Sequence, residues 1–245
     1  MASATGIPEV HPASTDGDTE NEPLLGRPGD VSQREDQNIL ANFTSGTAAL
    51  AQGGIWILAA LVWSTVLSNK LILFSAHPLL NSAATLLATQ AILVLQPTHT
   101  PQQKRTGTLT HVGLLALSTS AFIAAFTIIE INKADHPEYR FTSVHGILGL
   151  VTYIAIFLQA AIGIAQYFLP TLVFGSVENG KKVYRWHRFS GYWVLILELA
   201  TIAAATQTSY NKAVLHIRLW TVLVTIVLVI AGVFPRIKKY KLPSL

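Results

Sequence analysis

The sequence predicts an all-α integral membrane protein with six transmembrane helices. Of its 245 residues, 51% are hydrophobic and 12% are charged, a balance far from that of a soluble domain. Six apolar runs are each long enough to cross a bilayer, and lipid leaves the backbone little alternative to a helix. The connections are short, so successive helices should be antiparallel neighbours. The runs cover residues 48–67, 71–95, 109–131, 141–168, 187–208 and 214–234.

Residues 1–46 differ in composition from the rest of the chain. They are acidic, rich in Pro, Gly, Ser and Thr, and almost without apolar pattern, so they should form a disordered tail. They also lack the basic and apolar regions of a signal peptide. Within them, Glu20-Asn21-Glu22-Pro23-Leu24-Leu25 resembles an acidic dileucine sorting signal, a pattern that also arises by chance. The membrane domain is expected over 47–235, followed by a short basic tail over 236–245.

Lysine and arginine are unequally divided between the two faces of the predicted bundle. Twelve fall on the face that carries both termini and five on the other. Cytosolic loops are enriched in these residues, so both termini should be cytosolic. The Asn42-Phe43-Thr44 sequon would then be cytosolic and unglycosylated. We expect a multi-pass protein of an endomembrane, either vacuole- or lysosome-like or ER, rather than of the plasma membrane.

Histidine is the candidate metal ligand. The chain has no cysteine, and its only methionine is Met1, which excludes thiolate and internal methionine ligands. His77, His111, His145 and His187 each lie near the N-terminal end of one of four consecutive predicted helices. Because these helices alternate in direction, His77 and His145 fall near the non-cytosolic face, and His111 and His187 near the cytosolic face. The two pairs should lie about 20 Å apart along the membrane normal.

This layout suits two haem groups, each clamped between histidines on facing helices. A haem with two protein ligands has no open position, which favours electron transfer over oxygen chemistry. A glycine follows four residues after the histidine in two of the helices, as Gly149 follows His145 and Gly191 follows His187. Each glycine would leave a bare patch of backbone against which a flat macrocycle can lie.

One further histidine competes for these positions. His216 begins the sixth predicted helix on the non-cytosolic face, and by spacing alone it could replace His77 or His145. An interfacial histidine beside Arg218 is the simpler interpretation.

The second to fifth helices resemble the core of the cytochrome b561 family, the ascorbate-dependent two-haem membrane oxidoreductases. The matching segments are His77-Pro78-Leu79-Leu80, His111 at the start of the third helix, Phe141-Thr142-Ser143-Val144-His145-Gly146, and Tyr184-Arg185-Trp186-His187-Arg188-Phe189-Ser190-Gly191-Tyr192. The last two are closest to the branch with the tumour-suppressor-like members. The resemblance covers about residues 50–235 and implies a four-helix bundle around two haems.

The resemblance also implies cofactors and partners. One haem b would be held by His77 and His145 and the other by His111 and His187, which leaves His216 without a ligand role. Ascorbate would be the cytosolic electron donor, with monodehydroascorbate or a ferric chelate as acceptor on the other side. Such proteins are often homodimers in the bilayer, and no nucleic-acid partner is expected. The arginine-rich segment that ends helix two in the best-known members is absent here, where the chain reads Leu95-Gln96-Pro97-Thr98, so any part it has in holding ascorbate or a propionate is not expected to carry over.

Polar residues flank the predicted non-cytosolic haem. Arg140, Thr142 and Ser143 immediately precede the His145 helix. A cation and hydroxyls at that place can meet haem propionates or hydrogen-bond a ligand's second nitrogen, and the resemblance puts propionate contacts on the same segment. The alternative for Arg140 is an interfacial anchor.

A cationic patch is predicted at the cytosolic haem. Lys104 and Arg105 precede His111, and Lys181 and Lys182 precede His187, in loops that should meet near the haem edge. Ascorbate is an anion, so this patch could attract and orient it. The family similarly uses a lysine at about the Lys104 position. Topology alone also enriches cytosolic loops in these residues.

Two other classes of function remain compatible with the sequence. A transporter or proton relay could use the intramembrane histidines with Glu198, which lies on nearly the same helical face as His187. A structural or adaptor membrane protein would use the histidines only in packing. An absorption spectrum separates the three, because a b-type band from two haems per chain supports electron transfer and a colourless protein removes it.

Overall fold

The computed structural model describes residues 31–34, 37–238 and 242–243, and this part of the chain is helical without a β-strand. Six of its helices are long and apolar enough to cross a membrane, which confirms the predicted all-α membrane fold. The long helices are α1 (Ala48–Leu67), α2 (Ala76–Leu95), α3 (Pro101–Asn132), α4 (Val144–Phe168), α6 (Val177–Ala205) and α7 (Leu219–Val233). Short elements are α5 (Pro170–Phe174), the 3-10 turns η1 (Ile39–Phe43), η2 (Leu73–Ser75), η3 (Pro137–Tyr139) and η5 (Phe234–Arg236), and the π-turn η4 (Asn211–Leu215).

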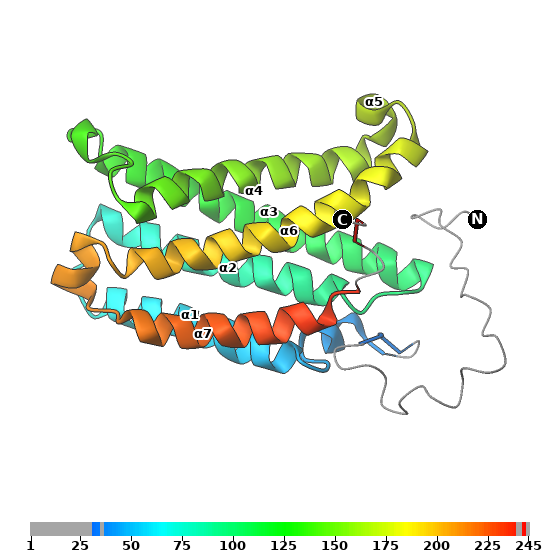
Figure 1. The fold of residues 1–245 in the computed structure, drawn as a ribbon, viewed down its shortest axis with the longest axis horizontal. Helices are drawn as coiled ribbons and strands as arrows, with labels where there is room; N and C mark the ends of the chain where they lie inside the picture. Colours follow the sequence, from blue (N-terminus) through cyan, green and yellow to red (C-terminus); the bar gives the residue numbers. More distant parts are fainter. Residues whose placement is uncertain (1–30, 35–36, 239–241, 244–245) are drawn as a thin grey trace.

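The long helices pack in pairs. α2 runs along α3, α4 along α6, and α1 along α7, as Figure 1 shows. Buried apolar side chains of α1, α2, α6 and α7 form the main core, whereas the α2–α3 pair and the α4–α6 pair touch each other at few places. A smaller cluster around Ala84, Phe122, Tyr153 and Ile156 joins these two pairs at mid-length. A cavity remains between the two pairs on one side of that cluster.

Two helices begin earlier than the apolar runs predicted. α3 starts at Pro101 rather than near 109, and the Thr100 side chain caps it by accepting from the Gln103 backbone N–H. α6 starts at Val177 rather than 187, with Ser176 as its cap. Capping residues and a proline at the first helical position are the signals that mark these starts. The lysines and arginines assigned to the second and fourth loops therefore lie in the N-terminal parts of α3 and α6.

The boundary of the folded domain also needs correction. Residues 31–34 and 37–46, predicted as part of a disordered tail, are ordered against the ends of α2 and α3, and Asn42 is only 1% exposed. The Asn42 amide donates to the Gln33 side chain and to the Val94 carbonyl, both at 2.9 Å. Its burial leaves no room for a glycan at the sequon. The proposed dileucine signal lies outside the described residues.

The C-terminal end of α7 is held to the same place. Arg236, predicted as the first residue of a short basic tail, is 2% exposed, and its guanidinium donates to the Asn42 and Leu93 carbonyls and the Ser45 hydroxyl. Both ends of the described chain therefore lie at one end of the bundle (Figure 1), as an even number of spans requires.

Glycine makes the close crossing of α1 and α7 possible, and the pair Gly53 and Gly54 provides a matched test. A Cβ on Gly54 would lie 2.6 Å from the Thr225 carbonyl oxygen, whereas one on Gly53 would have nothing within 4 Å. We expect Gly54→Ala to destabilise the protein by about 1–3 kcal/mol through overpacking. Gly53→Ala should leave stability equal or slightly higher, because alanine favours the helix. Thermal unfolding of both variants in the same detergent measures the difference, and equal midpoints would contradict the crossing described here.

Candidate haem-binding sites

A cavity of about 710 Å³ opens between the two helix pairs at the end opposite the described chain ends, with His77 and His145 in its wall. The centres of their rings are 6.4 Å apart and their planes are nearly perpendicular, at 86°. A bond from a metal to an imidazole nitrogen is about 2 Å long. Two such bonds, together with the distance from each ring centre to its own nitrogen, add up to roughly the measured separation. One metal therefore fits between the two imidazoles.

The second ring nitrogen of three histidines is already bound to a neighbouring helix. His77 Nδ1 lies 3.0 Å from the Ala125 carbonyl oxygen, and His145 Nδ1 lies 3.0 Å from that of Thr201. His111 Nδ1 lies 2.8 Å from the Ala91 oxygen. A carbonyl can only accept, so Nδ1 carries the proton and Nε2 keeps its lone pair for a metal. These residues therefore fit the haem that the sequence predicts.

His111 and His187 lie at the other end of the bundle. The carbonyl that holds His111 belongs to Ala91, fourteen residues after His77 in α2, which is about 21 Å along a helix axis. His187 is near enough to His111 for electrostatic interaction. The depth sorting of the four histidines therefore agrees with the structure, although His111 and His187 lie three turns inside their helices rather than at the ends.

His187 is held differently from the other three histidines. Its Nδ1 is buried and has no hydrogen-bond partner in the described part of the chain. Instead the ring lies over Gly163 of α4, where an added Cβ would be 3.0 Å from Cε1 and 3.5 Å from Nε2. The Gln159 amide donates to the His187 carbonyl at 2.6 Å, and its oxygen accepts from the Ser190 hydroxyl. The sequence reasoning missed Gln159 and Gly163, which lie one turn apart on α4.

The two glycines four residues after histidines differ from each other. Gly149 lines the cavity, and a Cβ there would meet only the Thr201 methyl at 3.9 Å, so its backbone is bare as predicted. Gly191 is not bare, because the Gln159 amide nitrogen would lie 2.9 Å from its Cβ. Its lack of a side chain makes room for Gln159 rather than for a macrocycle.

Arg140, Thr142 and Ser143 all line the cavity that contains His145. Arg140 pairs with Glu130 at 3.4 Å, and its Nε is buried with no hydrogen-bond partner among the described residues. Ser143 caps α4 by accepting from the Gly146 N–H at 3.0 Å, and Thr142 donates to the Tyr139 carbonyl. Arg140 thus lines the cavity and keeps a donor without a partner among the described residues, whereas the two hydroxyls have local partners.

Helix geometry separates the four cations predicted near His111 and His187. Lys104 lies seven residues, about two turns, before His111 in α3 and therefore on the same face. Arg105 is the next residue in α3, so it lies on a neighbouring face of the helix, and it is exposed. Lys181 and Lys182 lie in α6 off the His187 face, and Lys182 contacts Glu178 at 3.9 Å.

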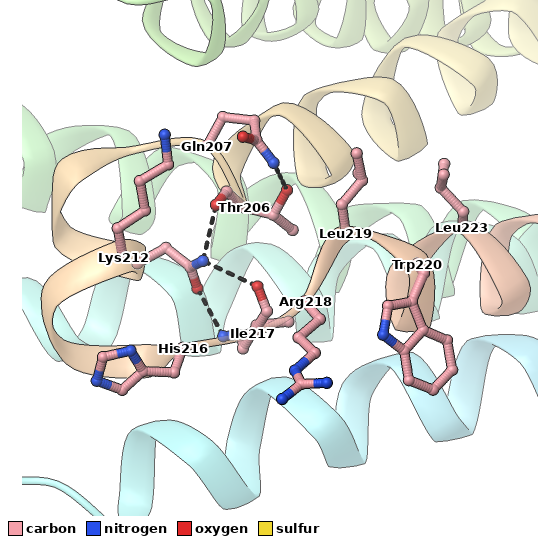
Figure 2. Close-up of a pocket in the computed structure, with 10 residues that line it drawn as sticks. Thr206, Gln207, Lys212, His216, Ile217, Arg218, Leu219, Trp220 and Leu223 are labelled. Carbon is pink, nitrogen blue, oxygen red and sulfur yellow. Dashed lines mark hydrogen bonds between the residues drawn. The ribbon is translucent and has the colours of Figure 1, made fainter.

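His216 lies outside the paired arrangement. It does not begin a helix but occupies the turn between η4 and α7 with φ 54°, and its side chain is exposed. Figure 2 shows it with Lys212 and Arg218 around a neighbouring pocket of about 870 Å³. It is not among the residues that line the cavity of His77 and His145.

The contact between Gly163 and His187 predicts a selective defect. Gly163→Ala should displace the His187 imidazole and weaken or remove the haem predicted there, because the added Cβ is tighter against the ring than an ordinary contact. We expect loss of up to half the haem, read from the absorption spectrum of the reduced protein. Gly53→Ala, which adds a methyl to open space, is the control for helix propensity. Full haem content with unchanged spectra would show that α4 does not set the position of this ligand.

Comparison with known proteins agrees with this arrangement. A family model described as eukaryotic cytochrome b561 matches residues 76–212, more than half of the chain and the whole stretch from the start of α2 to η4. Searches of curated proteins and of solved structures give no match. The matched stretch contains His77, His111, His145 and His187 and the carbonyls that hold three of them. The chain belongs to the cytochrome b561 family.

Proposed function

We propose that the protein carries electrons from cytosolic ascorbate through two bis-histidine b haems to monodehydroascorbate or a ferric chelate on the opposite side of the membrane. The family supports transmembrane electron transfer and haem binding in general. The observation that carries the finer proposal is the pair of histidine sites, about 21 Å apart at opposite ends of one bundle. When bound, each haem would supply a one-electron redox centre without an open coordination position.

The non-cytosolic site would be His77 with His145. Arg140 would bind a propionate of this haem through the N–H groups that Glu130 leaves unused. Thr142 and Ser143 line the same wall, where their role would be to shape the segment rather than to bind directly. Lys133, which the sequence reasoning did not single out, also lines the cavity and donates to the Tyr139 carbonyl at 2.9 Å. Two cations at the mouth favour an anionic acceptor.

The cytosolic site would be His111 with His187, and Lys104 would orient ascorbate near it. Lys104 is half-buried on the His111 face of α3. Arg105, Lys181 and Lys182 would contribute through their charge alone, since their positions on α3 and α6 turn them from the ligand faces. Charge on this end also supports a cytosolic placement of both termini. An endomembrane location and a homodimer remain parts of the proposal.

The competing functions give a different result in one measurement. A transporter or proton relay using Glu198, or a structural membrane protein, would be purified without colour. Two b-type haems per chain in the reduced absorption spectrum would support the proposal, and a colourless, folded protein would refute it.

The pairing of ligands can be tested at the non-cytosolic site. His145→Ala should lose about half of the haem and spare the centre that ascorbate reduces first, because only one of two sites loses a ligand. Haem content per chain and the spectrum after ascorbate addition give the answer. His216→Ala is the matched control and should keep both haems. If His145→Ala instead removes the centre that ascorbate reduces first, the pairing or the orientation is wrong.

The donor site can be tested through charge. Lys104→Ala should slow reduction by ascorbate several-fold at low substrate and flatten its salt dependence, since a nearby cation raises the local concentration of an anion. Arg105→Ala removes the same charge from the neighbouring helical face and should have a smaller effect. Stopped-flow reduction at two or more ionic strengths measures both variants. Equal kinetics for Lys104→Ala and the parent, with both haem spectra intact, would place the donor elsewhere.

A further inference from the structure

A carboxyl group lies inside the cavity of His77 and His145. Glu198 of α6 is 5% exposed and lines the cavity wall. Glu198 lies three residues, about one helical turn, before Thr201. The Thr201 carbonyl accepts a hydrogen bond from His145 Nδ1. Glu198 therefore lies just inward of the His145 ligand, toward the middle of the membrane.

The carboxyl group is only partly satisfied. The Thr85 side chain is its polar neighbour, and Oε2 is buried without a hydrogen-bond partner among the described residues. An ionised carboxylate is costly in such a place unless a positive charge balances it. The two cations that line the cavity lie on the opposite, outer segment, where Arg140 pairs with Glu130 and Lys133 donates to the Tyr139 carbonyl.

The other titratable groups around the cavity are occupied or peripheral. His77 and His145 each donate an Nδ1 proton to a carbonyl. Tyr153 donates to Asn81 at 2.8 Å. The remaining ionisable residues of the lining are Glu130, Lys133, Tyr139, Arg140 and Tyr210. Of the two carboxyl groups in this lining, Glu130 has an arginine partner and Glu198 has none among the described residues.

We propose that Glu198 is a proton-binding site coupled to the redox state of the non-cytosolic haem, an inference that rests on the proposed function. The ferric centre of a bis-histidine haem carries one net positive charge, which can balance a nearby carboxylate. One-electron reduction would remove this charge, so the carboxylate would lose a counter-charge in a low-dielectric site. Reduction is then accompanied by uptake of one proton on a Glu198 oxygen, from non-cytosolic water through the cavity.

The step balances in both directions. Reduction takes one electron from the cytosolic haem and one proton from water, and the Glu198 carboxylate becomes a carboxylic acid. When the acceptor takes the electron, the same proton leaves the carboxyl group. Ascorbate supplies the electrons and the non-cytosolic acceptor removes them, so no further reactant is needed.

A redox titration at several pH values tests the proposal. Because the reduced form binds the proton, the midpoint potential of the non-cytosolic haem should fall as pH rises, by up to about 59 mV per unit for one electron. Glu198→Gln should abolish this slope with both haems still bound. Glu178→Gln, in the exposed first turn of the same helix, is the matched control and should keep the slope. A flat titration of the parent, or a slope that persists in Glu198→Gln, would overturn the proposal.

Infrared difference spectra provide a second readout if the glutamine variant does not fold. On reduction, the parent should gain a carboxylic acid C=O band that shifts in deuterated water, and Glu198→Asp should keep such a band. Absence of any such band in the parent would overturn the proton site. A protein without two haem spectra would instead refute the proposed function, so the two failures are distinguishable.

Discussion

Hydrogen bonds from imidazole to backbone carbonyl across helices are the interaction on which this structure depends. Lipid offers no partner to a buried N–H, so a buried imidazole must find one inside the protein, as His77, His111 and His145 do. His77 binds a carbonyl of α3 and His111 binds one of α2, which joins these helices from both ends. His145 bonds to α6 in the same way, and Gln159 of α4 bonds to the His187 carbonyl. These bonds define the two tight helix pairs.

The spacing between the pairs follows from this arrangement. Once α2 is bound to α3 and α4 to α6, His77 of one pair faces His145 of the other across the cavity, with ring centres 6.4 Å apart. At mid-length Phe122 and Phe126 of α3 pack on Tyr153 of α4, with ring centres 6.0 and 5.0 Å apart. This aromatic layer closes the bundle between the histidine sites. The cavity of His77 and His145 therefore ends at this layer, and neither His111 nor His187 lines it.

Much of this architecture could be predicted from the sequence. Six apolar runs and four histidines at alternating ends predicted the spans and the two depths, because length and direction alone determine them. The starts of α3 and α6 could not be read from apolarity, since their first turns are polar and lie outside the apolar runs, although Thr100 and Ser176 are recognisable caps. Gln159 and Gly163 were missed for another reason: they act on His187 through tertiary contact between α4 and α6, and no spacing along one helix reveals that. The ordered residues before 47 were missed because their polar composition suggested disorder. They are ordered because Asn42 is buried and hydrogen-bonded to distant residues, which composition alone does not reveal.

The hydrogen bonds around Arg236 join segments from the beginning, middle and end of the described chain. One guanidinium nitrogen reaches the carbonyls of Asn42 and Leu93, and the Asn42 amide reaches Val94. These hydrogen bonds attach the segment before α1 and the segment after α7 to the C-terminal end of α2, in a closed network that we call the Arg236 ring. A shortened fragment that begins at residue 47 would open this ring and leave a buried cation without two of its three acceptors. Gln33 and Asn42 therefore belong to the packed structure, and a fusion partner or affinity tag belongs upstream of them.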